Sequence, residues 1–352
     1  MKNNFKSFVN FIIIFFCWFS ISHSNDQFIF DVTEIEILKN GNQINGYKGG
    51  TVTTLDGDKI IAEEFLYNKI ENILEAKGSV QFINKINQIT IFSDNAIYFK
   101  NEEKVTTKGN SKAVDKKNTI TANEFYYDKI KNILNAKESV EIIDLEKNIK
   151  IYSDDITYFK NEEKVTTIGE TISLVENKYN FKSSDVSYFH LTSNLSSQKK
   201  STVEDNEGNI YKLDKFNYSL KKKLLKGKNL KIFSKNNNNK SDEYFFSEGF
   251  FNLEKKSFVS KATKIKIYKD IFGNKENDPR LYGSTSSGDE NKTVINKGIF
   301  TSCKFTNKRS PWCIKSKKIT HDKINQNLIY ENAILKVYDV PVMYFPKFFH
   351  PD

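Results

Sequence analysis

Residues 98–107 read YFKNEEKVTT, and residues 158–167 read YFKNEEKVTT again. The repetition extends to both sides: residues 60–109 align with residues 120–169, and 30 of the 50 aligned positions are identical. Repetition at a fixed period indicates stacked structural units, each of which buries its apolar face on its neighbours. The duplicated unit therefore predicts an elongated architecture rather than one compact core.

Apolar residues inside the unit fall two positions apart. Leu74, Ala76 and Val80 alternate with polar or small neighbours, and Ile89 and Ile91 continue the pattern. A period of two is typical of a β-strand with one buried face, whereas an amphipathic helix needs apolar residues three and four apart. Short polar turns such as KNEE separate the runs, so we expect roughly four short strands in each unit.

The same alternation recurs more loosely along the rest of the chain. It is visible in residues 179–183, 230–232 and 265–267, and aromatic residues, which suit pleated strand surfaces, make up 14% of the chain. The predicted fold class is all-β: an elongated, open, solenoid-like stack of short antiparallel strands.

The first segment has the features of an export signal. Lys2 and Lys6 precede an apolar run over residues 8–21, and the small residues Ser22 and Ser24 follow it. The run is shorter than the roughly 20 residues that an α-helix needs to span a bilayer. We therefore predict that residues 1–24 are a signal peptide, cut after Ser24, and that the protein is exported.

Charge and cysteine content narrow the class of function. The net charge of +10 becomes +8 when Lys2 and Lys6 are removed. This excess could serve an anionic partner such as a phosphorylated lipid, or it could reflect a compositional bias toward lysine. Two cysteines remain after the signal, Cys303 and Cys313, and an exported protein makes them disulfide candidates, with each other or with a partner elsewhere.

Searches for catalytic motifs find nothing. The sequence holds no Gly-x-Ser-x-Gly, no Gly-rich phosphate loop and no His-Glu-x-x-His. Adjacent carboxylates such as Glu102-Glu103 fall in turns or on opposite strand faces, where we expect solvated charges rather than a shared site. The expectation is a protein that is not an enzyme, with no cofactor, no metal site and no nucleic-acid partner.

The chain is expected to have two parts after the signal. Residues 25–292 form the repeat-bearing domain, with turn-rich breaks over residues 234–242 and 274–291, and residues 293–352 form the final strands. The last residues, PVMYFPKFFHPD, are aromatic and contain three prolines, whereas a domain usually ends in a short polar tail. We expect the natural protein to continue into a further domain.

These residues resemble a known family. Ile60-x-Ala62, Tyr67 and Leu74-x-Ala76-x-Gly78-x-Val80, with their copy from Ile120, look like the OstA-type repeat of lipopolysaccharide-transport proteins. The later segments GIFTSC (298–303), ITHD (319–322) and VPVMYFP (340–346) are similar to the connection into the barrel of the LptD family. The resemblance is to the N-terminal, OstA-like periplasmic part of LptD, truncated before the barrel.

The resemblance implies a fold, a function and partners. The fold would be an OstA/LptA-type β-jellyroll with an apolar groove that conducts the acyl chains of lipopolysaccharide toward a C-terminal β-barrel, at the periplasmic face of the outer membrane. The partners would be lipopolysaccharide, an LptA-like jellyroll added by strand pairing, and an LptE-like lipoprotein if the barrel is present. In the family, a cysteine matching Cys303 forms a disulfide to the barrel.

Two other functions stay open: a free-standing LptA-like periplasmic bridge and a structural β-solenoid or adhesin-like protein. The inward set of the alternation supplies the candidate lipid-groove residues, and the alternative is that these residues fill a closed core. They are Ile60, Ala62, Leu74, Ala76, Val80, Ile89, Ile91, Ile120, Ala122, Leu134, Ala136, Val140, Ile149 and Ile151.

Overall fold

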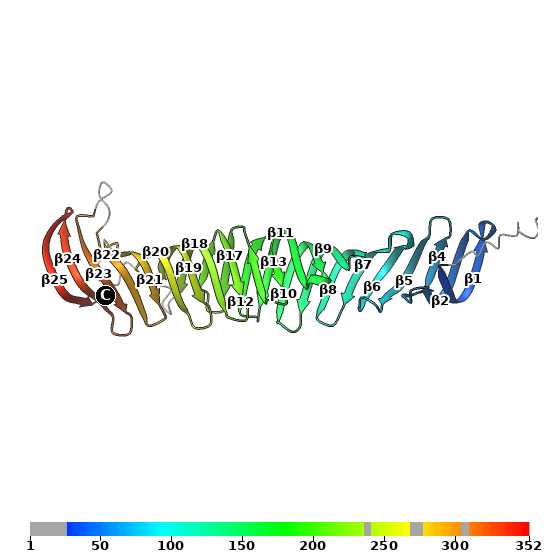
Figure 1. Cartoon of the computed structure of the whole chain (residues 1–352), viewed down its shortest axis with the longest axis horizontal. Helices are drawn as coiled ribbons and strands as arrows, with labels where there is room; N and C mark the ends of the chain where they lie inside the picture. Colours follow the sequence, from blue (N-terminus) through cyan, green and yellow to red (C-terminus); the bar gives the residue numbers. More distant parts are fainter. Residues whose placement is uncertain (1–26, 236–240, 268–276, 304–309, 352) are drawn as a thin grey trace, which may run out of the picture.

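The computed structural model describes residues 27–235, 241–267, 277–303 and 310–351. These residues form 25 strands in one continuous antiparallel sheet, which confirms the predicted all-β, elongated β-jellyroll. Figure 1 shows the strands stacked side by side along a single rod, from β1 at one end to β25 at the other. The predicted signal peptide, residues 1–24, lies outside the described residues.

The strands of the first half are β1 (Phe28–Leu38), β2 (Gln43–Thr54), β3 (Lys59–Ala62), β4 (Glu64–Asn68), β5 (Ile73–Asn84), β6 (Ile89–Phe99), β7 (Lys104–Val114), β8 (Asn118–Asp128), β9 (Ile133–Asp144), β10 (Ile149–Phe159), β11 (Lys164–Val175), β12 (Tyr179–Ser184) and β13 (Ser187–Phe189). Those of the second half are β14 (Asn194–Ser197), β15 (Ser201–Asp205), β16 (Ile210–Leu213), β17 (Lys215–Ser219), β18 (Leu224–Lys235), β19 (Ser241–Asn252), β20 (Ser257–Lys266), β21 (Arg280–Gly288), β22 (Lys292–Thr301), β23 (Trp312–Asp322), β24 (Asn327–Val337) and β25 (Val340–Pro351). Three 3-10 turns, η1 (Lys39–Gly41), η2 (Lys100–Glu102) and η3 (Lys160–Glu162), separate some of them.

Each unbroken strand between β1 and β25 pairs with its neighbours in chain order. Some strands are broken in two, so that β3 and β4 both pair with β2 and with β5. In the same way β12 and β13 both pair with β11, and β16 and β17 both pair with β18. When the two halves of each broken strand are counted as one strand, consecutive strands are neighbours in the sheet. One strand and the turn that follows it occupy about 15 residues.

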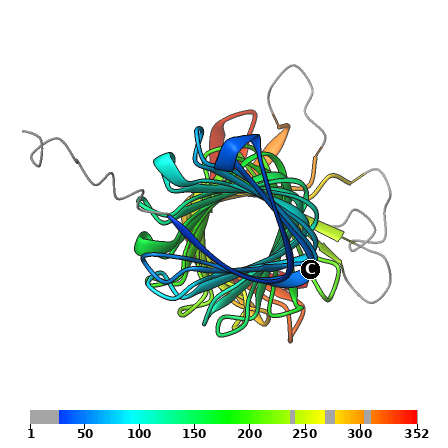
Figure 2. The same ribbon diagram turned by 90° about the vertical axis from the view of Figure 1, so that its right-hand side faces the viewer.

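Most long strands bend near the middle. The pairing register shifts between Lys77 and Val80 in β5 and between Lys108 and Ser111 in β7. Gly78 and Gly109 adopt φ values of 77° and 83° at these points, and a bulge of this kind bends a strand. Each bent strand therefore contributes to two walls that are joined along one edge, which we call the hinge edge. Seen end-on in Figure 2, the strands run around a common axis.

Successive turns lie on two opposite rims, because antiparallel strands leave and enter at alternate ends. Rim A contains residues 39–42, 69–72, 100–103, 129–132, 160–163, 190–193, 220–223 and 253–256. Rim B contains residues 55–58, 85–88, 115–117, 145–148, 176–178 and 206–209.

Backbone hydrogen bonds run along each rim from turn to turn. On rim A, the Lys160 N–H donates to the Asn132 carbonyl (3.1 Å) and the His190 N–H donates to the Glu163 carbonyl (3.0 Å). On rim B, the Glu176 N–H donates to the Asn148 carbonyl at 2.8 Å. These bonds stiffen each rim along the rod.

The predicted break over residues 274–291 is wrong for part of its length. Residues 280–288 form β21, which pairs with both β20 and β22, so the sheet continues through the expected boundary at residue 292. The small residues that suggested a turn are needed for close packing. A Cβ on Gly283 would lie 2.2 Å from Cγ2 of Ile295, and Ser286 is 2% exposed in the same strand. Within the described residues, no helix is long and apolar enough to cross a membrane.

Candidate functional site

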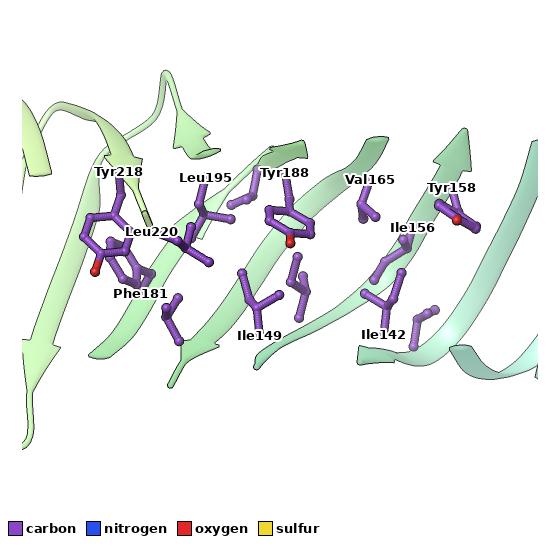
Figure 3. Packing of buried hydrophobic residues seen from close by; sticks show 14 of the residues in the cluster. Ile142, Ile149, Ile156, Tyr158, Val165, Phe181, Tyr188, Leu195, Tyr218 and Leu220 are labelled. Atoms are coloured by element: carbon purple, nitrogen blue, oxygen red, sulfur yellow. The ribbon is translucent and has the colours of Figure 1, made fainter. Parts of the chain in front are cut away.

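The interior of the rod is a continuous column of apolar side chains. It begins at Phe28 in β1 and reaches Ala333 in β24, and its members belong to one contiguous cluster. Figure 3 shows the middle of this column, where Ile142, Ile149 and Ile156 point toward the space between the strands. Because the residues alternate along each strand, one face of every strand supplies the column.

All fourteen candidate groove residues lie in this column. None is more than 9% exposed, and Leu74, Ile91, Leu134 and Ile151 are about as buried as a residue can be, at 1%. The structure therefore places the two copies of the repeat side by side on one interior, with Ile60 and Ile120 in equivalent positions.

Sequence reasoning missed the largest interior side chains. Phe65, Phe82, Tyr98, Phe125 and Tyr127 are all at most 3% exposed, and the ring centroids of Phe82 and Tyr98 lie 5.9 Å apart. The signal was present, because Phe82 is simply the next inward position after Val80. Each aromatic side chain buries more area than each of the aliphatic residues that were named.

The interior of the first repeat is tightly packed. The cavity that Ile60, Leu74, Ala76, Phe82 and Tyr98 line, with Ala96 and Val105, has a volume of only about 10 Å³. A cavity of this size has room for about one water molecule at most. At this level of the rod the two walls are in contact through their side chains.

A larger cavity lies further along the rod, in the C-terminal half. Its volume is about 270 Å³. Four aromatic side chains, Tyr244, Phe246, Phe251 and Phe258, form its apolar side, and the rings of Phe251 and Phe258 stack at 5.4 Å. Lys323 lies at its polar side, 5.7 Å from the centroid of Tyr244, and burial lowers the pKa of this ammonium group.

Opposite the hinge edge, side chains from rim A meet side chains from rim B. We call this line of contacts the seam. Lys160 on rim A donates to Asp115 on rim B at 2.8 Å, and Lys256 on rim A donates to Glu207 on rim B at 2.6 Å. Lys223 on rim A pairs with Glu176 on rim B. In the part of the chain that the structure describes, the contacts that we find across the seam involve at least one side chain.

The seam partners are separated by a regular distance in sequence. The pairs Lys160–Asp115, Lys223–Glu176 and Lys256–Glu207 are 45, 47 and 49 residues apart. With about 15 residues in each strand and turn, this offset is three strands. An odd number of strands takes the chain from one rim to the other, which is why these residues can close the rod.

A deeply buried lysine, Lys129, lies at one level of the seam. Its side chain is 7% exposed and its ammonium group contacts Asp56 (2.8 Å), Asp58 and Glu103. The hydroxyl of Tyr98 lies 2.9 Å from the same Nζ atom. The three carboxylates lie within 4.8 Å of one another, a spacing that could hold a metal ion. Because Lys129 contacts all three, this cluster already contains its cation.

The electrostatics of this cluster follow from burial and pairing. Burial by itself raises the pKa of the Asp56 carboxyl, but hydrogen bonds from Lys129, Thr54 and Lys100 bring that pKa well below its usual value. Burial lowers the pKa of Lys129 on its own, and the hydrogen bonds to Asp56, Asp58 and Glu103 outweigh it and raise that pKa. Lys129 is therefore positively charged and Asp56 negatively charged at neutral pH.

The seam repeats with variations along the rod. In the second copy of the repeat, the Tyr158 hydroxyl donates to Asp115 at 2.9 Å, and the Asn118 amide donates to Tyr158 at 3.0 Å. One level further, the Tyr188 hydroxyl donates to Asp144 at 2.6 Å, and His190 lies between Asp144 and Glu146. Sequence reasoning did not identify the seam, and it treated Glu103 as a solvated charge. The signal that could have been used is the identical KNEE turn in both repeats.

The two disulfide candidates lie near the end of the rod. Cys303 and Cys313 are free thiols, both partly buried. Burial raises the pKa of the Cys313 thiol. The Cys303 carbonyl accepts a hydrogen bond from Arg280, which ties this segment to the start of β21. The two residues therefore remain candidates for a disulfide, with each other or with another partner.

Comparisons with known proteins found a solved structure and a family model that are similar to parts of this chain. Among solved structures, LptH from Pseudomonas aeruginosa, described as the LptA homologous periplasmic component of the conserved lipopolysaccharide transport device, is similar over 33% of this chain and 93% of its own. The identity is 13% and the TM-score is 0.31. No curated protein matches the chain. A family model described as OstA-like protein matches residues 29–185. Over residues 29–185 the sequence is therefore similar to OstA-like proteins.

Proposed function

We propose that this chain carries the acyl chains of lipopolysaccharide along its interior, as a periplasmic part of a lipopolysaccharide-transport pathway. The observation that carries the proposal is the continuous apolar column, which runs from Phe28 in β1 to Ala333 in β24. An acyl chain gains roughly 0.8 kcal/mol for each methylene that it buries. A lipid moved through water needs an apolar path of this kind.

The sequence supplies the class of lipid. The OstA-like match over residues 29–185 and the resemblance of the repeat to lipopolysaccharide-transport proteins both point to this amphiphile. The net charge of +10 suits a phosphorylated head group outside the apolar path. The fourteen groove candidates, from Ile60 to Ile151, are the residues that we expect the acyl chains to contact.

The ends of the rod suggest how the chain joins its neighbours. Ile29, Ile35 and Ile37 on β1 are each more than half exposed, and so are Val342 and Phe349 on β25. An edge strand with exposed apolar residues is a template for pairing with another strand. We infer that an LptA-like jellyroll adds to β1, and that residues 293–352 lead into an LptD-like barrel with its LptE-like lipoprotein.

Photo-crosslinking from the interior tests the transport proposal. A photoreactive residue in place of Ile89 or Ile149, which are 3% and 1% exposed, is expected to capture lipopolysaccharide in cells. Thr90 and Lys150 point to the opposite strand face and are the matched control positions. Capture only from Thr90 and Lys150 would contradict the proposal and favour the alternative of a structural β-solenoid with a sealed core.

A further inference from the structure

We propose that the seam is a lateral gate: the two rims part along it to admit an anionic amphiphile, and the rim A cations then exchange their carboxylate partners for the head group. The inference rests on the proposed function and deepens it, because it assigns the entry route and the residues that receive the head group. It concerns Lys100, Lys129, Lys160, Lys223 and Lys256 with their rim B partners.

The interior itself requires that something opens. At the first repeat the cavity volume is about 10 Å³, which leaves no room for an alkyl chain between the walls. The side chains that fill the space, among them Phe82 and Tyr98, are packed by both walls. An acyl chain can therefore enter this level of the rod only if the walls move apart.

The two edges of the rod differ in what holds the walls together. At the hinge edge each strand passes from one wall to the other as continuous backbone, bent at Gly78 and Gly109 among others. At the seam the described contacts are ion pairs and hydrogen bonds that involve side chains, such as Lys160–Asp115. Continuous backbone cannot part, whereas an ion pair or a hydrogen bond can exchange its partner for another anion, so the seam is the edge that can open.

Rim A presents a regular row of basic side chains. Lys100, Lys129, Lys160, His190, Lys223 and Lys256 occupy successive rim A turns. Their spacing of 29 to 33 residues is two strands, which places them about 10 Å apart along the rod. Rim B supplies the acceptors Asp56, Asp115, Glu176 and Glu207, and Asp144, the last residue of β9 before the rim B turn 145–148, supplies a fifth. Lys117 on rim B with Glu163 on rim A reverses this polarity at one level.

An anionic head group can replace the rim B carboxylates as the partner of the rim A lysines. A phosphate oxygen accepts a hydrogen bond from an ammonium group as a carboxylate oxygen does. A phosphate that contacts Lys160 or Lys223 would release Asp115 or Glu176 to water as rim B moves away. The alkyl chain below the head group would at the same moment enter the apolar column. A lysine that receives the phosphate is therefore paired in both the closed and the open form.

A reversible cross-link across the seam tests the gate. Asp115→Cys and Lys160→Cys are combined in a chain in which Cys17 is alanine and Cys303 and Cys313 are serine, with a photoreactive residue in place of Ile149. A bis-maleimide with a cleavable disulfide spacer joins the two rims. Capture of purified lipopolysaccharide by the locked protein is expected to fall about tenfold, and cleavage of the spacer is expected to restore it.

A cross-link along one rim provides the matched control. The Asn132 amide donates to Asn161 at 2.8 Å, and both residues lie on rim A. Asn132→Cys with Asn161→Cys, joined by the same reagent, leaves the two rims free to part, and capture is expected to stay within about twofold of the unjoined protein. If the seam-locked protein captures lipopolysaccharide as well as the cleaved one, the gate is wrong and the transport proposal stands. If no form captures it from Ile149, the transport proposal fails as well.

The claim that the rim A lysines receive the anionic head group is tested separately, with two amphiphiles that have the same alkyl chain and different head groups. Lys100→Gln, Lys160→Gln and Lys223→Gln together are expected to weaken binding of dodecyl phosphate about tenfold and to leave dodecyl maltoside within about twofold. The control changes Lys77, Lys108 and Lys199 to Gln, because these side chains are more than half exposed and lie away from the seam. Equal losses for both amphiphiles, or a loss in the control, would overturn the head-group assignment.

Discussion

At the scale of single residues, two neighbouring glutamates in one turn differ in exposure and in their contacts with the seam. The side chain of Glu102 is 57% exposed, whereas that of Glu103 is 23% exposed and contacts Lys100 and Lys129. Glu103 caps the 3-10 turn η2 in the left-handed region, with φ of 51° and ψ of 43°. Glu163 does the same after η3. The conformation of the turn, rather than the residue type, therefore decides which glutamate enters the seam.

Asp115 allows a test of the seam's contribution to stability. Its carboxylate accepts hydrogen bonds from Lys160, Tyr158 and the backbone N–H groups of Lys117 and Asn118, at 2.8 to 2.9 Å. Burial by itself raises the pKa of this carboxyl, but the hydrogen bonds from Lys160 and the backbone bring the pKa below its usual value of 3.8. We expect Asp115→Asn to lower the free energy of unfolding at pH 7 by about 1–3 kcal/mol.

The contribution of Asp115 to the free energy of unfolding depends on pH, in a direction that its pKa determines. Because the folded pKa of Asp115 is below the unfolded one, its contribution is complete above the unfolded pKa and is lost as the pH falls through the folded pKa. Urea unfolding between pH 7 and pH 2.5 should therefore show a shallower acid decline in Asp115→Asn than in the unchanged protein. Asp154→Asn, an exposed residue, controls for the loss of one negative charge. Parallel pH curves for Asp115→Asn and the unchanged protein would contradict this account.

At the scale of the strand, the bend is the feature that turns a sheet into a two-walled rod. In β7 the hydroxyls of Thr107 and Ser111 lie 2.8 Å apart across the bend, and in β11 those of Thr167 and Thr171 lie 2.6 Å apart. These bonds occupy polar groups that the shifted register would leave buried without a partner. The bend therefore combines a left-handed residue, which changes the strand direction, with two hydroxyls that satisfy each other.

The two repeats offer a matched pair of glycines at the bend. Gly109 and Gly169 have φ values of 83° and 80°. A Cβ on Gly169 would meet nothing within 4 Å, whereas a Cβ on Gly109 would lie 2.5 Å from Oδ2 of Asp94. We expect Gly169→Ala to cost about 1 kcal/mol, which is the cost of the left-handed backbone alone. Gly109→Ala should cost more, because the side chain of Asp94 must also move.

Chemical denaturation of the two variants measures this difference. A Gly109→Ala variant as stable as Gly169→Ala would show that Asp94 moves without cost. Glu138, which occupies the place of Gly78 in the second repeat, already adopts φ of 65°. The protein thus tolerates one non-glycine residue at an equivalent bend, and the expected losses are moderate rather than complete.

At the scale of the whole molecule, the sequence predicts the interior well and the seam poorly. Ile60, Leu74 and Ile149 could be placed inside because alternation by two residues is a local property of each strand. The pairing of Lys160 with Asp115 depends on a shift of three strands between the rims, which the alternation does not encode. The strand β21 was missed for a different reason: Gly283 and Ser286 are small because neighbouring side chains approach closely, and small residues are also typical of turns.

A rod of stacked strands should tolerate the removal of one whole repeat. Deleting residues 110–169 joins Gly109 to Glu170, so that Gly109 takes the place of Gly169. The φ values of these two glycines, 83° and 80°, differ by only 3°. β13 pairs with Lys164, Val165 and Thr166, and the deletion offers it the identical KVT of residues 104–106. We expect a folded, β-rich monomer shorter by about 19 Å, four strand spacings, as measured by circular dichroism and small-angle X-ray scattering.

The matched control removes three strands in place of four. Deleting residues 110–154 joins Gly109 to Asp155, which lies in the half of β10 that runs back toward rim A. The fused strand would leave rim A and return to it, so neither wall could be completed and the sheet would be interrupted at that level. We expect this protein to aggregate or to lose its β-sheet signal. A well-folded product from the three-strand deletion, or an unfolded one from the four-strand deletion, would contradict the two-rim architecture on which the seam depends.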